Sequence, residues 1–314
     1  MRAAGVDIGT NSVRLLVAEV GRGEYGLHLE TLQRLMTITR LGEGVDERGI
    51  LNEDAMRRTA DVLRGYREIM QREETEAWEV AATSAAREAS NAEEFMGIVR
   101  EIMGKEPRVL TGDEEARLSF RGATYDLGSL RPMEGAILVM DIGGGSTEII
   151  AGRDGEILEE HSVDVGCVRM SERFLASDPP HPIELDEMEG YIRSLVSPLS
   201  AMISHWSPQL VVGLAGTITT LSGLKSGLDH YDGEAIHHSW LSLEDVEELY
   251  KRLYSLPLGS RRSYMSLEPG RADIIVGGTA VLKVLLQVLS VDRFLVSEKD
   301  ILDGLAISAA EGEG

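Results

Sequence analysis

A glycine-rich turn between two apolar stretches constrains this sequence more than any other feature. It spans residues 139–150 and contains Asp141, Gly143, Gly144, Gly145, Ser146, Thr147 and Glu148. Three successive residues without a Cβ allow positive φ, so backbone N–H groups can point into one concavity that binds anions. The pattern predicts a strand, a phosphate-holding turn and a second strand, with the hydroxyls of Ser146 and Thr147 as further donors.

Asp141 stands at the carboxyl end of the first of these strands. A carboxylate there can hold Mg²⁺, or a metal-bound water that bridges to phosphate. The alternative is a glycine-rich hairpin turn that binds nothing.

Repetition favours the phosphate site. Residues 4–17 have the same order of an apolar run, Asp7-Ile8-Gly9, small polar residues and an apolar run. A third loop, over residues 211–221, is again a strand that leads into a glycine and threonine turn. We expect these three loops to converge on one ligand from both sides of a cleft.

The chain has 314 residues, which exceeds the usual size of one domain. We predict two domains, at residues 1–122 and 123–314, with a last helix that is able to pack back on the first domain. Residues 131–135 are predicted to form the loop between them, because they contain Pro and Gly. In the first domain we expect three short strands, over residues 13–20, 25–32 and 35–41.

The net charge of −22 argues against a nucleic-acid partner, because most of the surface would repel a phosphate backbone. Most of these carboxylates are expected simply to solvate the surface. Apolar runs fall short of the ~20 residues that span a bilayer, and the N-terminus has no signal-peptide pattern. Cys167 is the only cysteine, which fits a reducing compartment. The sequence predicts a cytoplasmic protein without a membrane partner.

Two charged positions are candidates for chemistry. Arg87 follows a predicted strand over residues 77–82, at the end where open α/β sheets bind ligands. The alternative is an exposed surface arginine. Asp113, Glu114 and Glu115 begin a predicted helix, where they would complement the helix dipole. Because this segment lies at the junction of the two halves, one carboxylate there is also placed to face the cleft and accept a proton from water.

Several enzyme classes lose support. The sequence contains no Gly-x-Ser-x-Gly elbow and no P-loop lysine. The seven histidines form no His-Glu-x-x-His motif, and the adjacent His237 and His238 are expected to face different ways. These histidines are interpreted as surface or packing residues.

Five motifs together resemble the exopolyphosphatase/guanosine-pentaphosphate phosphatase family, in order and nearly end to end. They are residues 7–12, 82–87, 112–117, 141–148 and 213–217. That family belongs to the superfamily of actin, hexokinase and acetate kinase. The resemblance implies an α/β fold of two ribonuclease-H-like (actin-like ATPase) domains, with mixed sheets flanked by helices and the active site in the cleft between the domains.

The resemblance also implies a reaction. The terminal phosphate of inorganic polyphosphate is released, or guanosine pentaphosphate is converted to the tetraphosphate, by in-line attack of water with Mg²⁺ or another divalent cation. Glu115 matches the general base, Glu148 a carboxylate that positions water or metal, and Asp141 a metal ligand, with Asp7 in the same place of the first copy. The groups expected to bind phosphate are Asn11, Ser12, Arg87, Gly143, Gly144, Gly145, Ser146, Thr147, Gly216 and Thr217. A homodimer is also expected.

Two departures from the family pattern bear on substrate. Many members carry a C-terminal helical extension, whereas this sequence resembles the short form, which favours short polyphosphates or guanosine pentaphosphate. Near residue 300 the family pattern is Ser-x-x-Gly-Leu-Arg-x-Gly, but Asp300 replaces the glycine and Leu302 the arginine. Any substrate contact of that arginine is expected to be missing. The alternatives are a phosphotransferase of the acetate- or sugar-kinase type, and a sensor that binds guanosine tetraphosphate or polyphosphate without catalysis.

Overall fold

The computed structural model describes residues 1–23, 26–127 and 135–312. The chain forms two compact units, which are described separately: Met1–Met133 with Lys299–Gly314, and Glu134–Glu298. Apart from Gly135, the predicted linker at 131–135 lies outside the described residues. No helix in the described ranges has the length and apolar character needed to cross a membrane.

The first unit is built on a mixed five-stranded sheet. Its strand order is β3 (Gly26–Ile38), β2 (Ser12–Gly23), β1 (Arg2–Ile8), β4 (Ala77–Ala82) and β5 (Arg108–Val109). The β1–β2 and β2–β3 pairs are antiparallel, whereas β1–β4 and β4–β5 are parallel. The helices are α1 (Val45–Arg48), α2 (Glu53–Arg72), α3 (Ser84–Glu88), α4 (Ala92–Met103), α5 (Gly112–Thr124) and α14 (Ile301–Glu311).

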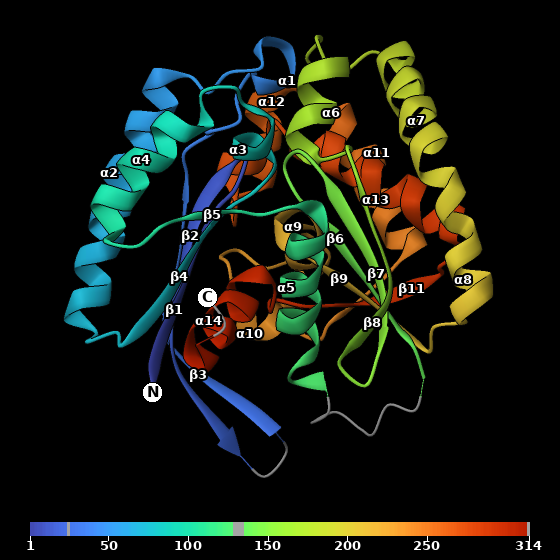
Figure 1. Ribbon diagram of the computed structural model, residues 1–314. Helices are drawn as coiled ribbons and strands as arrows, with labels where there is room; N and C mark the ends of the chain where they lie inside the picture. The colour runs from blue at the N-terminus through green and yellow to red at the C-terminus, as the bar shows by residue number, and fades with distance from the viewer. Residues whose placement is uncertain (24–25, 128–134, 313–314) are drawn as a thin grey trace. The chain divides into compact units, whose positions relative to one another are not determined.

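Helices cover both faces of this sheet (Figure 1). Because side chains alternate along a strand, Leu15 of β2 packs in the core formed with α2 and α4, and its neighbour Leu16 packs in the core formed with α14. Leu302, which replaces the family's arginine, is buried in this second core. Both faces are therefore closed within one unit.

One long strand replaces two of the predicted short ones. β3 runs without interruption from Gly26 to Ile38, and its register with β2 shifts at Val17 and Ala18. Val17 pairs with Gln33 and Ala18 with Thr31, so Leu32 is the extra residue of a β-bulge. Because a bulge interrupts the alternation of side chains between the two faces of a sheet, the sequence at the bulge resembles the end of a strand.

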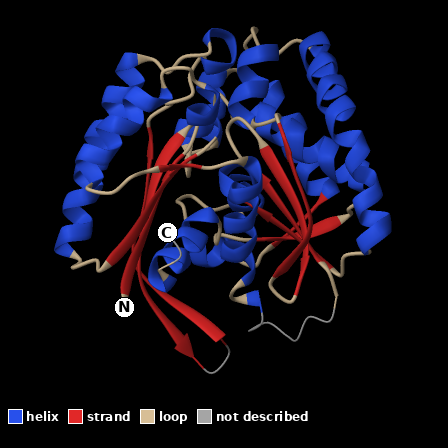
Figure 2. Cartoon of the chain, in the orientation of Figure 1, coloured by secondary structure: helices blue, strands red, loops and turns tan. Residues whose placement is uncertain are grey.

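The second unit has a six-stranded mixed sheet (Figure 2). Its order is β10 (Trp240–Ser242), β11 (Arg293–Val296), β9 (Leu210–Leu214), β6 (Ile137–Ile142), β7 (Thr147–Arg153) and β8 (Glu156–Val163). The helices are α6 (Cys167–Phe174), α7 (Pro182–Val196), α8 (Ser200–Trp206), α9 (Ala215–Lys225), α10 (Gly233–Ile236), α11 (Leu243–Ser255), α12 (Leu258–Tyr264) and α13 (Ile275–Leu289). The apolar α13 is buried along most of its length.

The two sheets repeat one topology. In each, the first strand forms an antiparallel hairpin with the second, and the second forms another with the third. The first strand also pairs in parallel with the fourth, which gives the orders β3-β2-β1-β4-β5 and β8-β7-β6-β9-β11. The predicted glycine turns connect the first two strands of each copy. This confirms the predicted α/β fold, with two mixed sheets flanked by helices.

The C-terminal helix belongs to the first unit. α14 packs against α5 and β1, and α5 continues to Thr124, so the first unit extends past the predicted boundary at residue 122. The contact needs glycine on both helices. A Cβ at Gly122 would overlap the carbonyl oxygen of Asp300, and one at Gly304 would overlap the carbonyl oxygen of Leu118.

Gly304→Ala is expected to lower the free energy of unfolding by about 1–3 kcal/mol, because α14 must move away from α5 to admit the methyl group. Gly65→Ala is the matched control, since a Cβ at Gly65 of α2 meets nothing within 4 Å. That change should raise stability by roughly 0.5–1 kcal/mol. Scanning calorimetry of both variants measures the difference, and equal stability of the two would contradict the close packing of α14.

Candidate active site

The glycine turn of the second unit is held against the start of α6. Gly143 N–H donates to the Ser146 carbonyl oxygen at 3.0 Å, which closes the β6–β7 hairpin. The carbonyl oxygens of the three glycines accept from the α6 segment. The bonds are Cys167 N to Gly143 O (3.0 Å), Val168 N to Gly144 O (2.9 Å) and Arg169 Nε to Gly145 O (2.8 Å).

These bonds orient the amides of the turn. In a trans peptide the C=O and N–H groups point in opposite directions, so the N–H groups of Gly144, Gly145 and Ser146 are turned away from α6. Three N–H groups that point to the same side form a site suited to an anion.

The reason for the glycines differs from the prediction. None of the described glycines with positive φ lies in this turn. Instead, α6 approaches the turn so closely that a Cβ at Gly166 would overlap the Gly144 carbonyl oxygen and lie 2.6 Å from Gly145 N. This close backbone contact requires glycine at residue 166, and the turn itself holds none of the left-handed glycines.

Asp141 and Glu148 are directly opposite each other on β6 and β7, so their side chains share one face of the sheet. Their exposures are only 7% and 1%, and Ser162 Oγ donates to Glu148 Oε1 at 2.8 Å. Two poorly solvated carboxylates at facing positions repel each other, and a divalent cation with oxygen ligands offsets that repulsion. This pair therefore fits a Mg²⁺ site.

Thr147 is fully buried, and its Oγ1 donates to the Val165 carbonyl oxygen at 2.5 Å. Because the Thr147 hydroxyl proton is donated to a carbonyl oxygen within the second unit, this contact favours a structural role over the predicted contact with phosphate. Ser146 is the hydroxyl that belongs to the turn itself.

The third loop lies beside the glycine turn within the second unit. It connects β9 to α9, and Ala215 there has a positive φ of 70°. Cys167, whose N–H is bonded to Gly143, also forms a side-chain hydrogen bond with Thr217 at the start of α9. Burial raises the pKa of the Cys167 thiol, which keeps it neutral in this contact. Cys167 thus links the two loops.

Arg271 is a candidate that the sequence analysis missed. A Cβ at Gly216 would overlap its guanidinium, so this cation packs on the backbone at the start of α9. Arg271 is mostly buried and forms an ion pair with Glu268 at 3.5 Å. Its only signal in the sequence is a lone arginine before a long apolar stretch.

The β1–β2 turn of the first unit repeats the hairpin closure, with Gly9 N–H donating to Ser12 O at 3.0 Å. Here the backbone N–H groups of residues 39–42 hold the turn's carbonyls: Thr39 and Arg40 donate to Asn11 O, and Gly42 donates to Thr10 O. The N–H groups of Asn11 and Ser12 are therefore turned away from that segment. The Asn11 Nδ2 atom is buried without a hydrogen-bond partner.

Asp7 at the end of β1 has two different carboxylate oxygens. Oδ2 accepts from Arg14 Nε at 2.9 Å and from Arg14 Nη2 at 2.7 Å, while the buried Oδ1 has no hydrogen-bond partner. Burial raises the pKa of Asp7 above its ordinary value, although Arg14 opposes that shift. A buried oxygen without a donor is suited to a cation or to a water bound to one.

Glu115 and Glu114 of α5 have different environments. Glu114 closes a capping box with Thr111, and the Thr111 backbone N–H together with Arg108 lowers the pKa of its carboxyl. Glu115 is 8% exposed, and its Oε2 accepts from Arg87 Nη1 at 3.1 Å. Arg87 Nη1 also donates to Leu110 O at 2.7 Å. Arg87, whose side chain is 26% exposed, and the buried Glu115 therefore form an ion pair.

The predicted site residues thus form one group in each unit: the β1–β2 turn and the Arg87–Glu115 pair in the first, and the linked β6–β7 and β9–α9 loops in the second. The expectation that both groups meet at one ligand stays a prediction.

Comparison with known proteins gives consistent matches. The model of the Ppx/GppA phosphatase family matches residues 16–312. The chain is 40% identical over 319 residues to exopolyphosphatase 2 of Mycobacterium tuberculosis, which covers 98% of each chain. A crystal structure of the Aquifex aeolicus member of the Ppx/GppA family is 31% identical, covers 100% of this chain and 99% of its own, and has a TM-score of 0.82. An exopolyphosphatase from Cytophaga hutchinsonii is 29% identical, covers 99% and 98%, and has a TM-score of 0.87.

Proposed function

Because this chain belongs to the Ppx/GppA phosphatase family, we propose that it is an exopolyphosphatase that releases phosphate from the end of inorganic polyphosphate. One observation carries this proposal: the amides of the Gly143–Ser146 turn are turned to one side, next to the buried pair of Asp141 and Glu148. Amide donors beside two carboxylates suit a phosphate that is bound together with a divalent cation.

Phosphatases of this family generally depend on a divalent cation. In this chain Asp141 and Glu148 would hold Mg²⁺, and Oδ1 of Asp7 is the corresponding group in the first unit. When bound, the cation offsets negative charge on the phosphate oxygens. The amides of Gly144, Gly145 and Ser146 neutralise the phosphoryl oxygens without any rearrangement of the turn.

Glu115 is proposed as the general base. The oxygen of water bonds to the terminal phosphorus while the P–O bond to the rest of the polyphosphate breaks, and the proton of that water passes to a Glu115 carboxylate oxygen. Arg87 Nη1 holds Glu115 Oε2, which fixes the direction of the carboxylate. Holding the base in one orientation contributes to the rate because no orientational freedom is lost during the reaction.

We propose inorganic polyphosphate, with short chains preferred, as the substrate and guanosine pentaphosphate as the second candidate. The family match and the similarity to exopolyphosphatase 2 support a polyphosphate substrate. The test is a phosphate-release panel with polyphosphates of defined length, guanosine pentaphosphate and ATP, each with Mg²⁺. Release of inorganic phosphate from the polymer end supports the proposal. Transfer of phosphate to an acceptor instead of water would identify a phosphotransferase, and tight binding without turnover under any divalent cation would identify a sensor.

Gly166→Ala is expected to reduce kcat/KM for polyphosphate by about tenfold, since the methyl group would push α6 away from Gly144 and misplace the amide donors. The control is Gly190→Ala in α7, where a Cβ meets nothing within 4 Å. Steady-state phosphate release compares the two. Similar kinetics for both variants would show that the close contact of α6 with the turn does not matter for substrate.

A homodimer and a cytoplasmic location stay predictions. Light scattering during gel filtration measures the first, and fractionation of cells that express the protein measures the second.

A further inference from the structure

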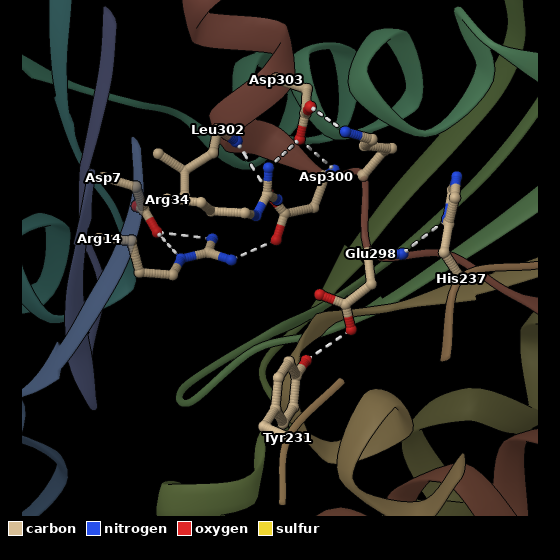
Figure 3. A network of polar contacts seen from close by, with 10 residues as sticks. Asp7, Arg14, Arg34, Tyr231, His237, Glu298, Asp300, Leu302 and Asp303 are labelled. Carbon is tan, nitrogen blue, oxygen red and sulfur yellow. Dashed lines mark hydrogen bonds and ion pairs between the residues drawn. The ribbon is translucent and has the colours of Figure 1, made fainter. Parts of the chain in front are cut away.

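A chain of alternating charges connects Asp7 to the start of α14 in the first unit (Figure 3). Arg14 is bonded to Asp7 through Nε and Nη2, and its Nη1 donates to Asp300 Oδ2. Arg34 follows: its Nη2 lies 3.4 Å from Asp300 Oδ1, and its Nη1 lies 2.9 Å from Asp303 Oδ2. Lys299 Nζ is 3.6 Å from the other oxygen of Asp303. Carboxylates and cations alternate from one end of this chain to the other.

Asp300 has two functions in this chain of charges. Its Oδ1 accepts from Leu302 N at 3.0 Å, which caps α14, and its Oδ2 faces Arg14. It is 4% exposed, and burial alone would raise its pKa, but Arg14 and Arg34 lower that pKa below its ordinary value. Asp300 is therefore a buried anion in direct contact with the guanidinium that contacts Asp7.

The position of this anion has a consequence for Asp7. A guanidinium bonded to one carboxylate oxygen competes with a metal ion for the negative charge of that carboxylate. An anion on the far side of the guanidinium offsets the positive charge and holds the group on Oδ2, so that Oδ1 keeps no donor. The glycine of the family pattern has no side chain with which to do this.

We propose that Asp300 is a positioning residue for cation binding: by holding Arg14 and balancing its charge, it keeps Asp7 Oδ1 available to a divalent cation. This inference rests on the proposed function, in which Asp7 contributes to binding of a divalent cation.

The test uses Asp300→Asn in the full-length protein. Asparagine is as good a helix cap as aspartate, so the bond to Leu302 N is kept while the charge is lost. Titration with Mn²⁺ alone, followed by the electron paramagnetic resonance signal of the free ion, measures cation binding without substrate. We expect Mn²⁺ to bind about tenfold more weakly. Without the Asp300 charge, the positive charge of Arg14 is no longer balanced and repels the nearby cation, and at an intermediate dielectric this repulsion is of that size.

Two further variants separate charge from structure. Arg14→Gln in the Asp300→Asn background removes the unbalanced cation and should restore Mn²⁺ affinity to within about threefold of the wild type. Asp300→Asn in an Asp7→Asn background should change the affinity no further, because the carboxylate through which it acts is gone. If Asp300 only capped α14, Arg14→Gln would not restore Mn²⁺ affinity. Asp300→Asn would also have the same effect on that affinity with or without the Asp7 carboxylate.

Three outcomes distinguish failure of the inference from failure of the proposed function. If wild type and Asp300→Asn bind Mn²⁺ equally, or if Arg14→Gln brings no recovery, the inference is overturned while phosphate release by the wild type still supports the proposed function. If the wild type binds Mn²⁺ and the variants behave as expected but no substrate releases phosphate, the proposed function fails and the inference on Asp300 stands. A wild type that binds no Mn²⁺ overturns both the inference and the cation's part in the proposed function.

Discussion

Replacement of Glu115 by glutamine lowers phosphate release from polyphosphate by about 10²–10⁴-fold, the usual contribution of a general base. Glutamine has nearly the same shape, and its carbonyl oxygen still accepts the bond from Arg87 Nη1. It cannot accept a proton from water. The loss should therefore appear in kcat, with little change in KM or in the midpoint of thermal unfolding.

Glu114→Gln is the matched control, because it is the same substitution at the neighbouring residue. Glu114 bonds the Thr111 backbone at 2.9 Å in the capping box, a bond that glutamine also forms. Its activity should stay within about twofold of the wild type, as a residue that only caps the helix contributes nothing to proton transfer. If both variants lose activity equally, the acidic start of α5 acts as a whole, and Glu115 is not the base.

Asp141→Asn is expected to separate activity from stability. Loss of a cation ligand should reduce phosphate release by about 10²–10³-fold, which corresponds to several kcal/mol of lost charge stabilisation. Without divalent cations, however, the variant should be as stable as the wild type or more stable by about 0.2–1 kcal/mol. The reason is that Asp141 and Glu148 are like charges directly opposite each other in the sheet.

Thermal unfolding with and without Mg²⁺ checks this prediction together with the activity assay. Mg²⁺ should raise the unfolding temperature of the wild type and have a much smaller effect on Asp141→Asn. The control is Asp154→Asn in the exposed turn after β7, where φ is 55° and asparagine fits well. A fall in stability without Mg²⁺ that is specific to Asp141→Asn would contradict the repulsion between the two carboxylates.

Local chemistry explains what could be predicted from sequence. Aspartate followed by glycines at the end of an apolar run identified both hairpin turns, because strand, turn and donor groups lie within a dozen residues. The family resemblance, which rests in part on that repeated pattern, implied the two mixed sheets.

Partners distant in the chain explain what was missed. Thr147 stays a predicted phosphate donor, but its hydroxyl is bonded to the carbonyl oxygen of Val165, a partner 18 residues away that the local pattern does not show. Arg271 gave only a weak signal, since its position against Gly216 depends on how the segment before α13 packs on the start of α9. The prediction that His237 and His238 face different ways was wrong: the rings stack with centroids 3.7 Å apart, because His238 has a φ of 61°.

The return of α14 to the first unit has a consequence for protein synthesis. Leu16, Ala18 and Val20 on β2 are buried against Leu302, Ala306 and Ile307 of α14, which a ribosome translates after the whole of the second unit. The second unit, Glu134–Glu298, is continuous and is complete before that helix emerges. An apolar face of the nascent N-terminal sheet therefore stays uncovered until α14 has been made, and it is the surface on which we expect a chaperone to act.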